Sequence, residues 1–98
     1  GVTLEHGISV IAPSELNFFL GGKYETLHTI ALVGGTASVE FQIYLDRELV
    51  YDSGLVENGA SLEIELPLKG ASELRMIVTD GGNGNTGDST AWADLWVQ

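Results

Sequence analysis

Hydrophobic and polar residues alternate along several stretches of the chain. In residues 37–46 every second position is apolar, namely Val39, Phe41, Ile43 and Leu45. Residues 62–66 repeat this pattern, with Leu62, Ile64 and Leu66 separated by Glu63 and Glu65. A period of two places one side of a strand in a core and the other in water. Both stretches are therefore predicted to be half-buried β-strands.

Further strands are expected at 15–20, 24–33, 74–79 and 93–97, and the strand at 74–79 is apolar on both sides, as in the middle of a sheet. Turn-forming residues separate these stretches, at Gly21-Gly22, Gly34-Gly35, Asp46-Arg47, Glu57-Asn58-Gly59 and Lys69-Gly70. No segment has a helical period. Short strands with regularly spaced turns predict an all-β, antiparallel β-sandwich of about eight strands, without a helix longer than two turns.

The apolar positions of these strands define an expected core. It comprises Leu16, Phe18, Phe41, Ile43, Ile64, Leu74, Met76, Val78 and Trp92. A chain of 98 residues forms one domain with one compact core. No apolar run approaches the roughly 20 residues that span a bilayer.

The charge of the chain excludes some partners. Fourteen acidic residues against four basic ones give a formal net charge of −10. Nucleic acids and anionic membranes are recognised through Lys and Arg, so neither is an expected partner. The same acidity permits a bound cation and keeps an exported domain soluble. The chain has no Cys, so no disulfide is expected.

Catalytic constellations are not evident, and we expect that the chain is not an enzyme. The two histidines, His6 and His28, lie in strand-like contexts, where a structural role is the more common one. No Gly-x-Ser-x-Gly elbow is present. Acids such as Glu63 and Glu65 alternate along strands, as they do on a solvated face rather than in the carboxylate pair of a glycosidase.

One glycine-rich segment, residues 79–88, has the composition of a cation site. It combines four Gly with Asp and Asn, whose oxygens suit Ca²⁺. We expect Asp80, Asn83, Asp88 and Asp94, with carbonyls of the segment, to hold Ca²⁺ or a water in its place. The alternative is an ordinary turn network in which Asn and Asp satisfy the backbone.

A second segment, Trp92-Ala93-Asp94-Leu95-Trp96, places an acid between two indoles at alternate positions. Strand alternation predicts that Trp92, Asp94 and Trp96 share one face. If that face is buried, Asp94 needs a cation or N–H groups as partners. If it is exposed, the two Trp rings form a platform on which a sugar can stack.

Several motifs follow one another in a characteristic order and spacing. They are Ala12-Pro13-Ser14-Glu15-Leu16, Leu20-Gly21-Gly22-Lys23-Tyr24, residues 39–46, Leu49-Val50-Tyr51-Asp52-Ser53-Gly54, residues 73–85, Asp88 and Trp92-Ala93-Asp94. Together they resemble the NPCBM family, also called carbohydrate-binding module family 51. The resemblance implies a galactose-binding-like jelly roll in a secreted or surface protein of bacteria, next to a glycosidase domain. It also implies binding of galactose-containing glycans and a structural Ca²⁺ in some members.

The chain departs from the family pattern at several points. Typical members have His where this chain has Ile11, and Asp-His where it has Asp88-Ser89. They usually have Asp-Gly where this chain has Asp46-Arg47, so a two-residue turn here would force Arg47 to a positive φ. They also carry an additional N-terminal stretch with an early strand. Residues 1–98 are accordingly expected to be one domain, either excised from a longer protein or lacking that strand.

Two functions follow from these observations. The first is a non-catalytic module that binds neutral, galactose-type glycans, with sugar contacts from Trp92, Asn85, Ser89 and Thr90. The second is a structural or protein–protein interaction domain that has kept the fold and lost the sugar site, which Ile11 and Ser89 favour.

Overall fold

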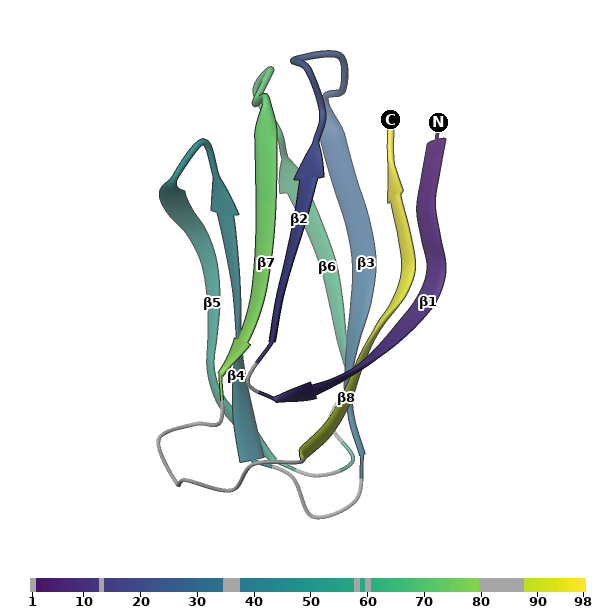
Figure 1. Ribbon diagram of the computed structural model, residues 1–98, viewed down its shortest axis with the longest axis vertical. Coiled ribbons are helices and arrows are strands. Elements are labelled where there is room, and N and C mark those ends of the chain that lie inside the picture. The colour runs from purple at the N-terminus through teal and green to yellow at the C-terminus, as the bar shows by residue number, and fades with distance from the viewer. Residues whose placement is uncertain (1, 13, 35–37, 58, 60, 80–87) are drawn as a thin grey trace.

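The described part of the chain forms two antiparallel sheets of four strands each. The computed structural model describes residues 2–12, 14–34, 38–57, 59, 61–79 and 88–98, with the backbone alone for 2–12, 38, 57, 88 and 89. Its strands are β1 (Val2–Ala12), β2 (Ser14–Phe19), β3 (Thr26–Val33), β4 (Ser38–Leu45), β5 (Glu48–Glu57), β6 (Ser61–Pro67), β7 (Glu73–Thr79) and β8 (Asp88–Val97). The strand orders are β1-β8-β3-β6 and β2-β7-β4-β5 (Figure 1). The predicted all-β antiparallel sandwich of about eight strands is confirmed.

The sandwich has two different ends. Strands β2 and β3, β4 and β5, and β6 and β7 are joined at one end, and both chain termini lie there too (Figure 1). We call this the turn end. The other four connections, including the one between β7 and β8, lie at the opposite end, which we call the loop end. The described residues include no helix that could cross a membrane.

The core lies between the two sheets and agrees with the expected one. Phe41, Ile43, Ile64, Leu74, Met76, Val78 and Trp92 are all buried. Leu16 and Phe18 are partly buried and pack against this cluster. Both belong to β2, which is an edge strand, so one side of each residue has no neighbouring strand to cover it.

The turn between β4 and β5 has the predicted positive φ at Arg47. Its φ is 72°, and that of Asp46 is 48°. Positive φ at both central residues is the mark of a type I′ turn, whose twist matches that of the flanking strands. The Asp46 carboxylate also accepts the backbone N–H groups of Ser72, at 3.0 Å, and Glu73, at 2.9 Å. These bonds fasten the turn to the start of β7.

Strand β8 departs from regular alternation at Asp94. Between His28 and Ile30 of β3 there is one residue, whereas between their partners Trp96 and Ala93 on β8 there are two. The extra residue forms a β-bulge, in which Asp94 has a φ of 47°. Trp92 therefore faces the core while Asp94 is exposed. The prediction that Trp92, Asp94 and Trp96 share one face is wrong, because the bulge reverses the alternation between them.

Candidate functional site

The loop end brings together the two positions at which the family pattern has histidine. In the pairing of β1 with β8, Ile11 lies opposite Ser89 and Ala12 opposite Asp88. Residues paired across an antiparallel ladder project from the same face of the sheet, with Cβ atoms about 5 Å apart. Two departures that are 78 positions apart in the sequence are therefore neighbours across one strand pair.

The residues expected to contact a sugar have different environments. Thr90 is 5% exposed and lies in the middle of its sheet, between Val10 and Val33. Trp92 is fully buried and packs edge-to-face on Phe41, with ring centroids 5.0 Å apart. A ring in this position cannot stack on a sugar, so the platform role of Trp92 is wrong, and the core alternative holds.

The remaining sugar candidates stay predictions. Asn85 lies outside the described residues. Ser89 is placed by its backbone only, as the second residue of β8. That backbone position is nevertheless informative, because it puts Ser89 at the loop end, opposite Ile11.

Of the four calcium candidates, Asp94 is separated from the loop end. Asp80 and Asn83 lie outside the described residues, and Asp88 begins β8. Asp94 follows Asp88 by six residues, roughly 20 Å at the rise of a strand. It is exposed, so it has no need of a buried counter-ion. In the part of the chain that the structure describes, no three His, Asp or Glu form a group suited to a metal ion. The inclusion of Asp94 in the site is therefore wrong.

The other indole, Trp96, faces outward and is covered by a histidine. The rings of Trp96 and His28 stack with centroids 4.0 Å apart and an interplanar angle of 6°. His28 Nδ1 in turn lies 3.6 Å from Glu65 Oε2 on the neighbouring strand. The His28 ring therefore lies against an indole on one face and has a carboxylate near its Nδ1 atom.

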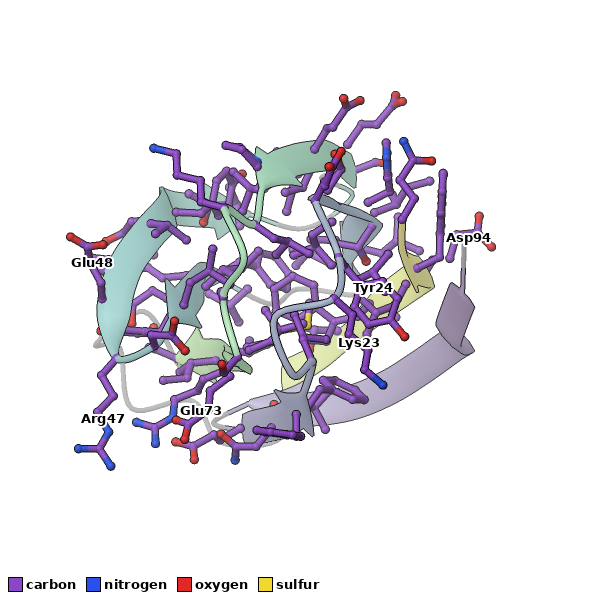
Figure 2. The ribbon with its side chains drawn as sticks, turned by 90° about the horizontal axis from the view of Figure 1, so that it is seen from above. Lys23, Tyr24, Arg47, Glu48, Glu73 and Asp94 are labelled. Carbon is purple, nitrogen blue, oxygen red and sulfur yellow. The ribbon has the colours of Figure 1, made fainter. Side chains whose placement is uncertain are left out.

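A polar hollow lies on the outer face of the second sheet, near the turn end. We call it the sheet-face site. It measures about 290 Å³, and its polar and exposed lining residues are Asn17, Phe19, Tyr44, Arg47, Glu73 and Arg75. Asn17, Arg75 and Tyr44 form one row across β2, β7 and β4, because each is paired with the next. Figure 2 shows Arg47 and Glu73 together at this end of the molecule.

The floor of the sheet-face site is held by hydrogen bonds. Arg75 Nε donates to Asn17 Oδ1 at 3.2 Å, and Asn17 Nδ2 donates to Glu15 Oε2 at 3.0 Å. Arg75 Nε also lies 3.7 Å from the same Glu15 oxygen. Each of the three side chains therefore restrains the other two.

Phe19 stands out in this hollow because its side chain is 80% exposed. Phe19 was not predicted to belong to a binding site, because Phe18-Phe19-Leu20 forms one continuous apolar run in the sequence. The alternation of β2 contained the signal: Glu15, Asn17 and Phe19 are exposed, whereas Leu16 and Phe18 are partly buried. Phe19 thus belongs to the polar face of its strand.

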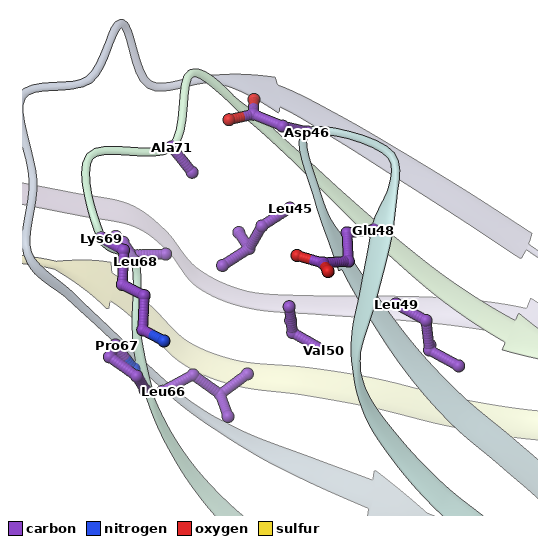
Figure 3. Close-up of a pocket in the computed structure, with 10 residues that line it drawn as sticks. All are labelled: Leu45, Asp46, Glu48, Leu49, Val50, Leu66, Pro67, Leu68, Lys69 and Ala71. Carbon is purple, nitrogen blue, oxygen red and sulfur yellow. The ribbon is translucent and has the colours of Figure 1, made fainter.

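A larger hollow of about 490 Å³ lies at the turn end between β5 and the turn after β6. Figure 3 shows Leu66, Leu68 and Val50 on its walls, with Glu48 and Lys69 coming from opposite sides. Most of its lining is aliphatic. It offers neither an aromatic ring nor a row of amide and guanidinium groups, so it is poorly suited to a ligand rich in hydroxyls.

The chain is a two-sheet antiparallel β-sandwich with shallow hollows on its surface. The family model described as "NPCBM/NEW2 domain" matches residues 1–98. Because this match covers the whole chain, the chain belongs to the NPCBM family. No curated protein sequence matches it.

Solved structures of Clostridium perfringens proteins have the same fold. CBM51 of GH95, in complex with methyl-galactose, has a TM-score of 0.84 and 32% identity over 94% of this chain and 69% of its own. The M60 catalytic domain of ZmpB with its CBM51-1 and CBM51-2 domains has a TM-score of 0.83 and 25% identity, over 93% of this chain and 10% of its own. CBM51-2 with GlcNAc and the INT domains of ZmpB has a TM-score of 0.84 and 22% identity, over 93% and 21%.

Proposed function

We propose that this domain is a non-catalytic carbohydrate-binding module that recognises neutral, galactose-type glycans. The observation that carries the proposal is its 32% identity, over 94% of the chain, to a module whose structure holds methyl-galactose. The net charge of −10 favours a neutral ligand over an anionic one.

We place the sugar at the loop end, near the pair formed by Ile11 and Ser89. Asn85 and Ser89 are the candidates for hydrogen bonds to sugar hydroxyls, through an amide and a hydroxyl group. Where the family pattern provides two imidazoles, this chain provides one hydroxyl and one aliphatic group. Fewer polar partners give a shallow, weak site, with a Kd of roughly 10⁻⁵ to 10⁻³ M.

A calcium ion near the same end is part of the proposal. Asp80, Asn83 and Asp88, with carbonyls of the glycine-rich segment, supply the hard oxygen ligands that Ca²⁺ prefers. Such an ion would neutralise carboxylates in a stretch of sequence that contains no Lys or Arg.

We also propose that the domain is one part of a longer, secreted or surface protein of bacteria, next to a catalytic domain. The chain spans only 10% and 21% of the two ZmpB structures, which contain further domains. Both termini of this domain lie at the turn end, so neighbouring domains attached there would leave the loop end open (Figure 1).

The alternative is a structural or protein–protein interaction domain that has lost its sugar site. The pairing of Ile11 with Ser89 favours it, because both family histidines are missing from one place.

Titration calorimetry with methyl-galactose tests the two functions. We expect saturable binding by the parent and tighter binding by Ser89→His, which returns an imidazole to the loop end. Ser61→His is the matched control, because it also places an imidazole at the loop end, but opposite Leu32 of β3 rather than opposite Ile11. It should bind like the parent. If neither the parent nor Ser89→His binds methyl-galactose up to roughly 10 mM, at the weak limit of specific binding, the alternative function replaces the proposed one.

A further inference from the structure

We propose that the sheet-face site is a second sugar subsite, which binds one neutral hexopyranose ring. The inference rests on the proposed function and goes beyond it, because the sheet-face site lies at the turn end. The two places are separated by the length of β7, whose seven residues span roughly 20 Å. A volume of about 290 Å³ is at the lower limit for small-molecule sites, and suits one ring rather than a chain.

Phe19 provides the apolar part of the site. An aromatic side chain that is 80% exposed leaves the water-covered face of its ring available to a ligand. The ring is positioned by the following turn: its Cε1 lies 3.6 Å from the place that a Cβ on Gly21 would take, and Gly21 has a φ of 67°. Pyranoses have an apolar C–H face that can pack on such a ring. Because the Phe19 side chain has few rotatable bonds, fixing it on binding loses little entropy.

Arg75 and Asn17 provide the polar part. Arg75 has five N–H donors, of which only the Nε–H takes part in its contacts with Asn17 and Glu15. Its four terminal N–H donors are not used in these contacts, and Arg75 lines the hollow. Asn17 likewise has one donor in use towards Glu15 and a second N–H to offer. Vicinal hydroxyls of a sugar can bond to this pair without any rearrangement, because the three side chains already hold one another.

The charges of the sheet-face site favour a neutral ligand. Arg47 and Arg75 line it together with the Glu73 carboxylate, and Glu15 lies 3.7 Å from Arg75. Two cations and two anions leave no net charge to attract a carboxylate or sulfate group. The mixture still supplies both donors and acceptors, which is what the hydroxyls of a neutral sugar require.

Two weak subsites on one domain would act together on a polymeric glycan. Once one subsite is occupied, the second meets its sugar at the high effective concentration set by the length of the glycan between them. A glycan long enough to span the roughly 20 Å along β7 would therefore bind more tightly than either monosaccharide.

The test is a ¹H–¹⁵N NMR titration of the whole domain with methyl-galactose and, separately, with GlcNAc. It follows the side-chain signals of Asn17 and Arg75 for the sheet-face site. For the loop end it follows the side-chain amide of Asn85 and the backbone amide of Ser89. The same titration is run on Phe19→Ala, on Phe19→Tyr, and on Leu55→Ala, a control that removes an apolar side chain of 57% exposure on β5, outside the hollow. Thermal melting of each variant shows that it is folded.

We expect one of the two sugars to shift the Asn17 and Arg75 signals saturably. Phe19→Ala should weaken this binding about ten-fold or more, the equivalent of one ring stacked on a sugar. Phe19→Tyr, which keeps a ring at this position, should bind more tightly than Phe19→Ala. Leu55→Ala should leave binding within about two-fold of the parent.

The outcomes separate this inference from the proposed function. Shifts at the loop end with none at Asn17 and Arg75 overturn the second subsite and leave the proposed function standing. Shifts at Asn17 and Arg75 that are equally strong in Phe19→Ala overturn it as well, since the ring then has no part in binding. If neither sugar shifts any of the four signals, both proposals fail.

Discussion

Arg47 is held in a backbone conformation that non-glycine residues avoid. Its φ of 72° places its Cβ close to a backbone carbonyl, which destabilises the turn by roughly 1–2 kcal/mol. Asp46 tolerates the same region better and is fixed by the N–H groups of Ser72 and Glu73. The Arg47 side chain lines the sheet-face site. Strain of this kind is often retained where a side chain serves binding.

Replacing Arg47 by glycine should therefore stabilise the fold and weaken the sheet-face site. We expect Arg47→Gly to raise the free energy of unfolding by about 1 kcal/mol, measured by urea denaturation, because glycine adopts a φ of 72° without a clash. Lys23→Gly is the control, since Lys23 is exposed in a turn but is not among the residues with positive φ. A stability of Arg47→Gly equal to or below that of Lys23→Gly would contradict the strain.

Tyr51 is the residue whose ionisation the fold opposes. Burial, and secondarily the negative charge of Asp52, raises the pKa of Tyr51 above its ordinary value of 10.0. Below pH 10 the phenol is neutral in both states and contributes no pH dependence. As the pH rises above 10, the unfolded state loses this proton first, so stability falls until the folded pKa is passed.

We expect urea denaturation of the parent to show this loss of stability above about pH 10. Tyr51→Phe should lose less stability over the same range, because the group that titrates is gone. Tyr44→Phe is the matched control, because it removes the hydroxyl of another half-buried tyrosine, on β4. Equal alkaline losses in Tyr51→Phe and the parent would show that Tyr51 is not responsible.

At the scale of elements, β4 joins the two halves of the second sheet and carries the centre of the core. It pairs with both β5 and β7, and Phe41, Ile43 and Leu45 point inward from it. Phe41 also contacts Trp92 of the opposite sheet, so it connects the two layers.

We expect Phe41→Ala to lower the free energy of unfolding by about 3–5 kcal/mol, as large-to-small changes in cores do. A loss of that size is a large part of the stability of a small domain and can prevent folding. Leu55→Ala, on an exposed part of β5, should change stability by less than about 1 kcal/mol. A melting temperature of Phe41→Ala within a few degrees of the parent would be inconsistent with the core described here.

At the scale of the whole molecule, the charges are unevenly distributed. All four basic residues, Lys23, Arg47, Lys69 and Arg75, belong to the three turns of the turn end or to the adjoining part of β7. The fourteen acidic residues include Asp80 and Asp88 on either side of the loop-end connection. The loop end, where we place the galactose-type ligand, therefore has no cation in its neighbourhood along the sequence.

We expect sialylated and heparin-like glycans to bind more weakly than neutral ones on a glycan array, because the field of a −10 domain repels anions. The difference should shrink as salt is added, since salt screens charges beyond about 10 Å at 0.1 M. A preference for the anionic glycans would contradict the neutral ligand that we propose for either subsite.

Calcium should stabilise the domain if the loop-end ion exists. An ion that binds only the folded state at a hundredfold excess over its Kd adds about 2.7 kcal/mol. We expect millimolar Ca²⁺ to raise the melting temperature of the parent and EDTA to lower it. Asp88→Asn should lose this response, whereas Asp94→Asn should keep it, because Asp94 lies roughly 20 Å further along β8. A parent that responds to neither addition would exclude the ion.

Regular alternation made much of this fold predictable. Residues 39–45 and 62–66 have the period of a half-buried strand, and both are strands with the expected residues inside. β5 was not predicted, because Asp52, Ser53 and Gly54 interrupt its pattern. The structure accommodates them with irregular pairing to β4, a φ of 68° at Gly54 and a bond from the Phe41 N–H to Ser53 Oγ.

The candidate sites were predictable only in part, for a related reason. The sequence identified Ser89 and Ile11 as departures, but only the pairing of β1 with β8 shows that they alter one place. It could not show that one extra residue at Asp94 turns Trp96 away from Trp92, since a bulge is a property of two paired strands. The sheet-face site combines residues from β2, β4 and β7, which no local pattern connects.

The sequence alone determined the class of fold and the inward face of the regular strands, and its net charge favours a neutral ligand over an anionic one. These follow from the spacing of apolar residues and from the net charge, which are properties of the chain itself. Only the tertiary structure decided which polar residues meet, that Trp96 faces away from Trp92 and that Phe19 is exposed. Those facts depend on register and on which strands lie next to one another, and both are set by packing between segments that are distant in the sequence.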